Sequence, residues 1–227
     1  AFSLLAVAQD GTAEILSKAV GRGTNLLAKA LPQTRLFVLG PLGSSFPDPT
    51  TDTTDLLVAG GVGLPPLFMQ AQRAARQGVS GQTEIIYGGR TAHDIVLLGE
   101  MQGLGVGLHL TTEDGAIGLH GRVTNALEAR LEHHRSTAST SKVRIMSCGP
   151  NAMLWAVGRI AEKYKVECFL SLEEQMACGI GVCLGCAIPA RSRPFRYVCK
   201  DGPVFAASDV LDVPATGGAF GGPSCAP

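Results

Sequence analysis

Strand-like and helix-like segments alternate between residues 56 and 172, and this rhythm limits the fold more than any other feature. Strands are predicted at 56–60, 84–89, 106–112, 142–149 and 166–172, and helices at 65–78, 92–101, 124–134 and 151–164. Short strands separated by helices of this length favour a parallel sheet with helices on both faces. The sequence therefore predicts an α/β unit in the middle of the chain.

Two glycine-containing turns follow strands of this predicted sheet. In "LLVAGGVGLPPL" a strand runs into Gly60, Gly61 and Gly63, and in "SCGPNAML" another ends at Cys148, Gly149 and Pro150. Glycines let the backbone approach a pyrophosphate, and the amides of a helix N-terminus attract its charge. Ligands of open α/β sheets bind outside the carboxyl ends of the strands, where both turns fall. A dinucleotide site is one interpretation and a plain tight turn is the other, because Pro66 replaces the third small residue of the usual motif. Cys148 either lines a nicotinamide pocket or is a buried thiol.

Four cysteines follow the α/β pattern in a tight cluster. Cys178, Cys183, Cys186 and Cys199 give the spacing C-x4-C-x2-C-x12-C. Disulfides are disfavoured, because adjacent turns of one loop would add little to a core that already exists. Four-thiolate zinc sites usually pair two C-x2-C units, whereas only Cys183 and Cys186 make one here. The x4 then x2 order is that of the plant-type [2Fe–2S] loop. The cysteines are predicted to hold a [2Fe–2S] cluster, with zinc as the alternative.

Composition excludes several classes of protein. Nineteen basic residues balance nineteen acidic ones, so no charge excess indicates nucleic acid or a membrane surface. No apolar run reaches the roughly 20 residues that span a bilayer. Seven clustered cysteines fit a secreted disulfide scaffold poorly, and we expect a cytoplasmic protein.

The first part of the chain has a different character. Residues 2–7, 13–20 and 35–43 are predicted as short strands and 25–31 as a short helix, after which "PDPTTDTTD" resembles a linker. A hydride donor gives two electrons whereas a [2Fe–2S] centre accepts one, so a flavin is needed between them. "VGRGTNLL" offers a second phosphate-binding turn for such a cofactor.

At this point the residues resemble a known family. The chain looks like the electron-transfer subunits of bacterial NAD-dependent dihydroorotate dehydrogenases, within the ferredoxin-reductase superfamily. The motifs that carry the resemblance are "FSLL", "VGRGT", "VLGPLG", "AGGVGLPPL", "YGGR", "SCGPNAML", "SLEEQMACGIGVCLGC" and "VCKDGPVF". The resemblance covers nearly the whole chain, and the last two motifs are its most specific part. It implies a partial antiparallel flavin-binding barrel at 1–48, an NAD-binding α/β domain at 52–165, a [2Fe–2S] domain at 166–213 and a flexible tail at 214–227.

The resemblance also implies the residues that bind each cofactor. The flavin motif falls on Ala1, Phe2 and Ser3, the next flavin strand on Leu16, Ser17 and Lys18, and the pyrophosphate turn on Gly23 and Thr24. NAD is assigned to Gly60, Gly61, Gly63, Cys148, Gly149 and Pro150, and the metal to the four motif cysteines. No residue is assigned a catalytic acid or base role.

The function implied by the resemblance is an electron relay. Hydride passes between NAD(H) and FAD, and single electrons pass through the cluster to a separate catalytic subunit, where dihydroorotate becomes orotate in UMP biosynthesis. The resemblance implies that the two kinds of subunit form a heterotetramer. An NADH-dependent ferredoxin reductase, a hydrogenase-associated diaphorase subunit and a zinc-stabilised binding module are the alternatives. Because the family's flavin arginine would precede Ala1 and the barrel region is short, the resemblance further implies a missing N-terminal part and weak FAD binding.

Overall fold

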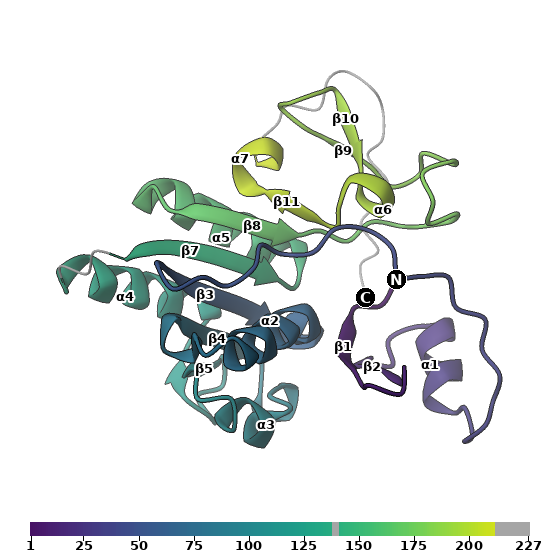
Figure 1. Cartoon of the computed structure of the whole chain (residues 1–227), viewed down its shortest axis with the longest axis horizontal. Coiled ribbons are helices and arrows are strands. Elements are labelled where there is room, and N and C mark those ends of the chain that lie inside the picture. Colours follow the sequence, from purple (N-terminus) through teal and green to yellow (C-terminus); the bar gives the residue numbers. More distant parts are fainter. Residues whose placement is uncertain (138–140, 212–227) are drawn as a thin grey trace.

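The computed structural model describes residues 1–137 and 141–211. A central sheet carries helices on both faces, a cysteine-containing lobe sits at one edge, and the N-terminal segment lies beside the sheet (Figure 1). The predicted tail at 214–227, with Cys225, lies outside the described residues.

The central sheet has seven strands in the order β11-β8-β7-β3-β4-β5-β6. All neighbours pair in parallel except β11, which is antiparallel to β8. Each strand predicted between residues 56 and 172 is present. The strands are β3 (Thr53–Gly60), β4 (Thr83–Gly89), β5 (Gly107–Thr112), β6 (Leu119–His120), β7 (Lys142–Cys148), β8 (Glu167–Ser171) and β11 (Val204–Ala206).

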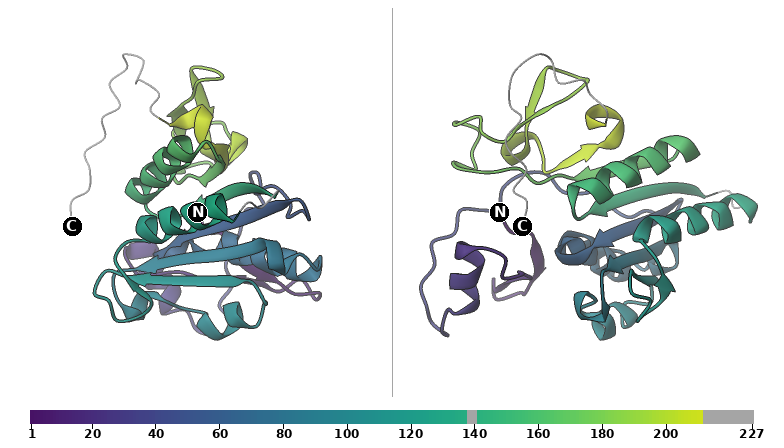
Figure 2. Two further views of the ribbon diagram at one scale, coloured as in Figure 1. Left: turned by 90° about the vertical axis from the view of Figure 1, so that its left-hand side faces the viewer. Right: turned by 180° about the vertical axis from the view of Figure 1, so that it is seen from behind.

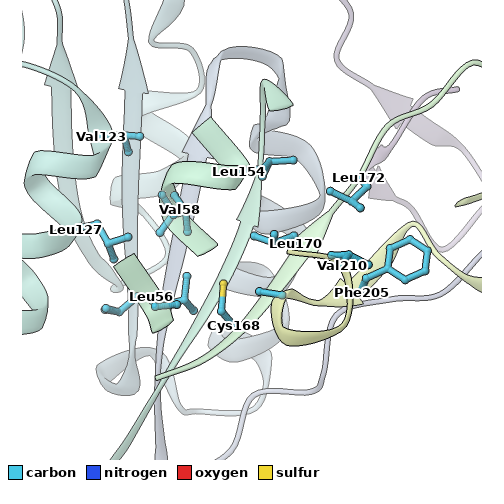
Figure 3. Close-up of a cluster of buried hydrophobic side chains, with 14 of the residues drawn as sticks. Leu56, Val58, Val123, Leu127, Leu154, Cys168, Leu170, Leu172, Phe205 and Val210 are labelled. Carbon is cyan, nitrogen blue, oxygen red and sulfur yellow. The ribbon is translucent and has the colours of Figure 1, made fainter. Parts of the chain in front are cut away.

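The two faces of the sheet belong to two apolar cores. Successive side chains of β3 alternate between them, so Leu56 and Val58 enter one core while Leu57 and Ala59 enter the other. Helices α4 (Val123–Ser136) and α5 (Asn151–Tyr164) cover the first face, and α2 (Leu64–Arg76) covers the second. The first core also contains Phe205 and Val210 of the cysteine lobe (Figure 3). The lobe and the sheet therefore share one packed interior.

The cysteine lobe is built from short elements after β8. It contains the hairpin of β9 (Ala187–Pro189) and β10 (Phe195–Tyr197), then α6 (Val198–Asp201), β11 and α7 (Ala207–Val210). Because β11 joins the edge of the central sheet, the lobe is hydrogen-bonded to it as well as packed against it.

The N-terminal segment is a hairpin followed by a short helix. Strands β1 (Leu4–Val7) and β2 (Ala13–Ile15) pair antiparallel, and α1 (Arg22–Ala28) follows. Leu5 is buried in the core under α2, which attaches the hairpin to the sheet. Figure 2 shows the same segment beside the sheet from two further sides.

Two predicted elements are wrong. The strand expected at 35–43 does not form, and the side chains of Leu36, Phe37, Val38 and Leu39 are exposed. No strand among the described residues pairs with this stretch, and an unpaired strand has no ladder to stabilise it.

The single helix expected at 92–101 is also wrong. It is replaced by a 3-10 turn, η3 (Ala92–Asp94), and by α3 (Leu98–Gln102). Between them Ile95 is extended and Leu97 is left-handed with φ 58°. This backbone lets three consecutive residues, Ile95, Val96 and Leu97, all pack against the core. In a helix, three consecutive side chains point in different directions and could not all do so.

Two further 3-10 turns are η1 (Gly61–Gly63) and η2 (Ser80–Gln82). None of the helices in the described ranges is long and apolar enough to cross a membrane.

Candidate functional site

The carboxyl edge of the sheet holds the first part of the candidate site. When the two-residue β6 is left out, the strands numbered along the chain lie in the spatial order 3-2-1-4-5-6. This is the order of doubly wound dinucleotide-binding sheets, although the sixth strand, β11, is antiparallel here. The direction of winding changes between β3 and β7, and doubly wound sheets bind their ligands at such a switch point. Both predicted glycine turns follow these two strands, at 60–63 and 148–150.

The two turns are locked together by close backbone contacts. A Cβ atom built on Gly63 would lie 2.2 Å from the carbonyl oxygen of Cys148, and one on Gly60 would lie 2.5 Å from the sulfur of Met153. Gly61 has φ 52° with no atom within 4 Å of a built Cβ, so its space is open. Backbone packing therefore requires glycine at 63, whereas a side chain at 60 would have to displace the flexible Met153 side chain. At 61 the positive φ favours glycine, and the space around it is open.

Cys148 itself lies in the core beneath these turns. Its side chain is 3% exposed, and burial raises the pKa of its thiol to about 12. The thiol is therefore neutral, and its position matches the buried-thiol interpretation. The carbonyl oxygen of Cys148 is the atom that Gly63 of the neighbouring turn approaches most closely.

Tyr87 supports the same edge and was not singled out by the sequence. It is fully buried on β4, and its hydroxyl oxygen lies 2.7 Å from the carbonyl oxygen of Asp94 and 3.1 Å from that of Gly61. Burial raises the pKa of this hydroxyl, which stays a hydrogen-bond donor. A tyrosine next to glycines in "EIIYGG" is a signal of such a support, because a buried hydroxyl must find an acceptor.

The cysteine lobe brings the four motif cysteines together as two pairs. The sulfurs of Cys186 and Cys199 are 3.3 Å apart in the core. Cys178 and Cys183 share the loop before β9, where the backbone N–H of Cys183 donates to the Cys178 sulfur at 3.4 Å.

The loop around Cys178 turns its amides toward the sulfur. Gly179 and Gly181 have φ 71° and 80°, and Val182 also donates its N–H to Cys178 at 3.4 Å. Hydrogen bonds from Cys183, Ile180 and Val182 lower the pKa of the Cys178 thiol to about 6. The backbone thus stabilises a thiolate, which is the form that binds metal.

This donor set fits a binuclear cluster better than a single ion. Tetrahedral zinc needs four donors around one centre, whereas a [2Fe–2S] cluster held by four cysteines takes two thiolates on each iron. Two separate cysteine pairs in one lobe match the second requirement.

Six of the eight predicted flavin residues, 1–3 and 16–18, directly flank the paired end of the N-terminal hairpin, where Leu4 pairs with Ile15. Gly23 and Thr24 lie in the first turn of α1. The Lys18 ammonium forms an ion pair with the Asp94 carboxylate, with 3.0 Å between Nζ and Oδ1. In the turn before α1, the Thr24 hydroxyl oxygen accepts the N–H groups of Val20 and Gly21. A Cβ on Gly23 would meet nothing within 4 Å, which leaves that turn open to a ligand. The exposed hairpin end is compatible with a flavin.

Comparison with protein families assigns two parts of the chain. Residues 57–159 match the oxidoreductase NAD-binding domain, and residues 173–211 match the iron–sulfur cluster binding domain of dihydroorotate dehydrogenase B. The second match contains all four motif cysteines.

Curated relatives share the same name. The dihydroorotate dehydrogenase B (NAD(+)) electron transfer subunit of Geobacillus kaustophilus is 36% identical over 89% of this chain and 76% of its own length. That of Listeria welshimeri is 38% identical over 88% of this chain and 75% of its own length.

Solved structures share the fold. An NADH-dependent reduced ferredoxin-NADP oxidoreductase superposes with a TM-score of 0.73 at 24% identity, covering 92% of this chain and 78% of the other. The ferredoxin reductase of carbazole 1,9a-dioxygenase superposes with a TM-score of 0.58 at 23% identity, covering 73% of this chain and 51% of the other.

Proposed function

The chain belongs to the family of electron-transfer subunits of NAD-dependent dihydroorotate dehydrogenase B, and from this premise we propose that it relays electrons between a dihydroorotate-oxidising catalytic subunit and NAD. The observation that carries the proposal is the cysteine lobe, which holds two thiol pairs and whose buried pair, Cys186 and Cys199, packs in one core with an NAD-type sheet. Because orotate is the product, the protein would act in the synthesis of UMP. We place it in the cytoplasm, in a heterotetramer with the catalytic subunit.

Each region of the chain has a defined task in this proposal. Cys178, Cys183, Cys186 and Cys199 hold the [2Fe–2S] cluster. The turns at Gly60, Gly61 and Gly63 and at Cys148, Gly149 and Pro150 bind the NAD pyrophosphate and nicotinamide. The flavin residues are Ala1, Phe2, Ser3, Leu16, Ser17, Lys18, Gly23 and Thr24.

Bound FAD supplies the conversion between two-electron hydride transfer and one-electron transfer to an iron–sulfur centre. The residues of this chain bind and orient the groups and need not move a proton. The buried pair Cys186 and Cys199 anchors the cluster to the core, while Cys178 and Cys183 lie toward the surface, where electrons can pass to a partner.

Anaerobic purification tests the proposal directly. The protein is expected to be reddish-brown, to contain iron and acid-labile sulfide in equal amounts, and to show an EPR signal after reduction. A colourless protein that contains zinc would overturn the cluster assignment. Co-expression with a dihydroorotate dehydrogenase catalytic subunit then tests the relay, since dihydroorotate should reduce NAD+ only when both chains are present.

A further inference from the structure

Residues 42–48, here called the bridging segment, connect the N-terminal segment to β3 and touch the cysteine lobe on the way. The Ser44 N–H donates to the Gly202 carbonyl oxygen at 2.6 Å, and the Ser44 hydroxyl donates to the Val204 carbonyl oxygen at 3.4 Å. A Cβ built on Gly179 would lie 3.5 Å from Leu42. In Figure 1 the chain passes beside α6 before it enters the sheet.

The other half of the bridging segment is fastened to the sheet. Phe46 is buried in the core under α2. The buried Gln70 side chain donates to the Pro47 carbonyl oxygen at 2.6 Å. Arg144 donates to the Asp48 carbonyl oxygen at 2.9 Å while it is paired with buried Asp55. The stretch that the sequence suggested as a linker is thus held from Pro47 onward by side chains of the sheet and of α2.

The contacts with the lobe lie next to the metal-binding positions. Gly179 follows Cys178 directly, and Gly202 is three residues after Cys199. Leu42 and Ser44 therefore contact the two chain segments that carry the first and fourth cysteines of the motif.

Gly43 leaves no room for a larger residue at this contact. A Cβ there would lie 2.5 Å from the Gly202 carbonyl oxygen and 2.7 Å from a ring carbon of Pro203. The opposing Gly202 is equally confined, because its own Cβ would lie 2.3 Å from the ring of Phe205. A side chain on Gly43 or on Gly202 would therefore force one of these segments to move.

We propose that Leu42, Gly43 and Ser44 fix the distance between the cluster and the flavin, with Gly43 as a positioning residue for electron transfer between them. The inference rests on the proposed function. The step is a single-electron transfer, in which one group is oxidised by one electron and the other reduced by one, with no bond formed or broken. The rate of electron transfer falls steeply with the separation of the two groups. A displacement of the lobe therefore slows electron transfer and leaves the rate of hydride transfer unchanged.

Gly43→Ala tests the inference, with Gly78→Ala as the matched control. Both glycines have positive φ, 82° and 73°, so alanine imposes a similar backbone strain at each. Only Gly43 is confined, since a Cβ on Gly78 meets nothing within 4 Å. Flavin reduction by NADH and cluster reduction are followed separately by stopped-flow absorbance in the cluster-containing protein, with FAD supplied in excess. Hydrogen–deuterium exchange of peptides that contain Ser44 supplies a readout independent of turnover.

The expected result is a loss in one step only. In Gly43→Ala cluster reduction slows by roughly tenfold to a hundredfold. Flavin reduction, the KM for NADH and the EPR signal of the dithionite-reduced cluster stay unchanged, while the amide of Ser44 exchanges faster. Gly78→Ala changes none of these. If Gly43→Ala does not fold, Leu42→Ala, which leaves the backbone unstrained, is expected to slow the same step less.

Two results overturn the inference. One is equal cluster reduction in Gly43→Ala and Gly78→Ala, and the other is unchanged exchange at Ser44 in Gly43→Ala. A failure of the proposed function is distinguishable, because NADH would then fail to reduce the cluster in the unaltered protein.

Discussion

Cys183 is the exposed member of the four motif cysteines, and its sulfur is the one whose loss disturbs the fold least. Cys183→Ser is expected to abolish or strongly change the EPR signal of the reduced cluster and to stop electron transfer beyond the flavin. Reduction of bound flavin by NADH should survive, because the glycine turns of the sheet are untouched. Cys225→Ser, outside the motif, serves as the control. An unchanged EPR spectrum in Cys183→Ser would falsify its assignment as a ligand.

Glu84 gives a second prediction at the residue scale. Burial alone would raise the pKa of its carboxyl, but hydrogen bonds from His109, Arg130 and His134 at 2.7–2.9 Å hold that pKa well below its usual range. A carboxyl whose pKa is lowered by folding stabilises the native state above its unfolded pKa of about 4.5, and this stabilisation is lost as the pH falls further. The slope for one such group approaches about 1.4 kcal/mol per pH unit.

Urea unfolding followed by Trp155, the only tryptophan of the chain, measures this effect. Between pH 4.5 and 3 the free energy of unfolding should fall more steeply in the unaltered protein than in Glu84→Gln, whose side chain does not titrate. Parallel pH profiles for the two proteins would show that Glu84 keeps an ordinary pKa.

The turn between β3 and α2 is the element on which the nucleotide site depends. Because a Cβ on Gly63 would lie 2.2 Å from a backbone oxygen of the neighbouring turn, Gly63→Ala must push the two turns apart. Overpacking of this kind costs about 1–3 kcal/mol. Binding of NADH should weaken in parallel, because the turns no longer meet at the switch point.

Gly99→Ala is the matched control for that turn. Gly99 lies in α3 with open space around it, so alanine is expected to leave NADH binding unchanged and to raise stability by up to about 1 kcal/mol. Titration of NADH and urea unfolding of both variants measure the two effects. Full NADH affinity in Gly63→Ala would show that the two turns need not touch.

Elements with a strong internal pattern could be predicted from the sequence, and elements defined by their neighbours could not. Helix α5 begins and ends where the sequence placed it, because its apolar period and flanking turns are local. The stretch at 92–101 contains helix formers such as Leu98 and Met101, yet the core beside β4 takes three consecutive apolar side chains and breaks the helix. The bridging segment has no pattern at all, since its contacts are backbone groups of Gly202 and side chains far along the chain.

The candidate site follows the same division. Cysteine spacing and glycine turns are visible in the sequence because their chemistry needs those residue types. The support of Gly61 by Tyr87, and the confinement of Gly63 by Cys148, depend on strands that are distant in sequence and adjacent in the sheet. For this reason the core position of the Cys148 side chain could not be decided from its motif.

At the scale of the whole molecule, the two edges of the sheet have different surroundings. The β11 edge carries the cysteine lobe, and the β6 edge lies at the other end of the strand order. In the loop that holds Cys178 and Cys183, the side chains of Ile180, Val182 and Leu184 are exposed. Apolar side chains gathered around an exposed metal-binding cysteine form a surface that suits a protein partner. In the proposed complex this surface contacts the catalytic subunit.

Leu184→Glu tests this contact. A carboxylate at the centre of an apolar interface loses its hydration without gaining a partner, so association with the catalytic subunit should weaken at least tenfold. The spectrum of the isolated protein should stay unchanged, because the Leu184 side chain is 52% exposed and glutamate meets solvent there. Leu119→Glu on the opposite edge has nearly the same exposure, 50%, and is expected to leave the complex intact. Size-exclusion chromatography of each variant mixed with the catalytic subunit measures the difference. Equal complex formation by the two variants would place the docking surface away from the cluster loop.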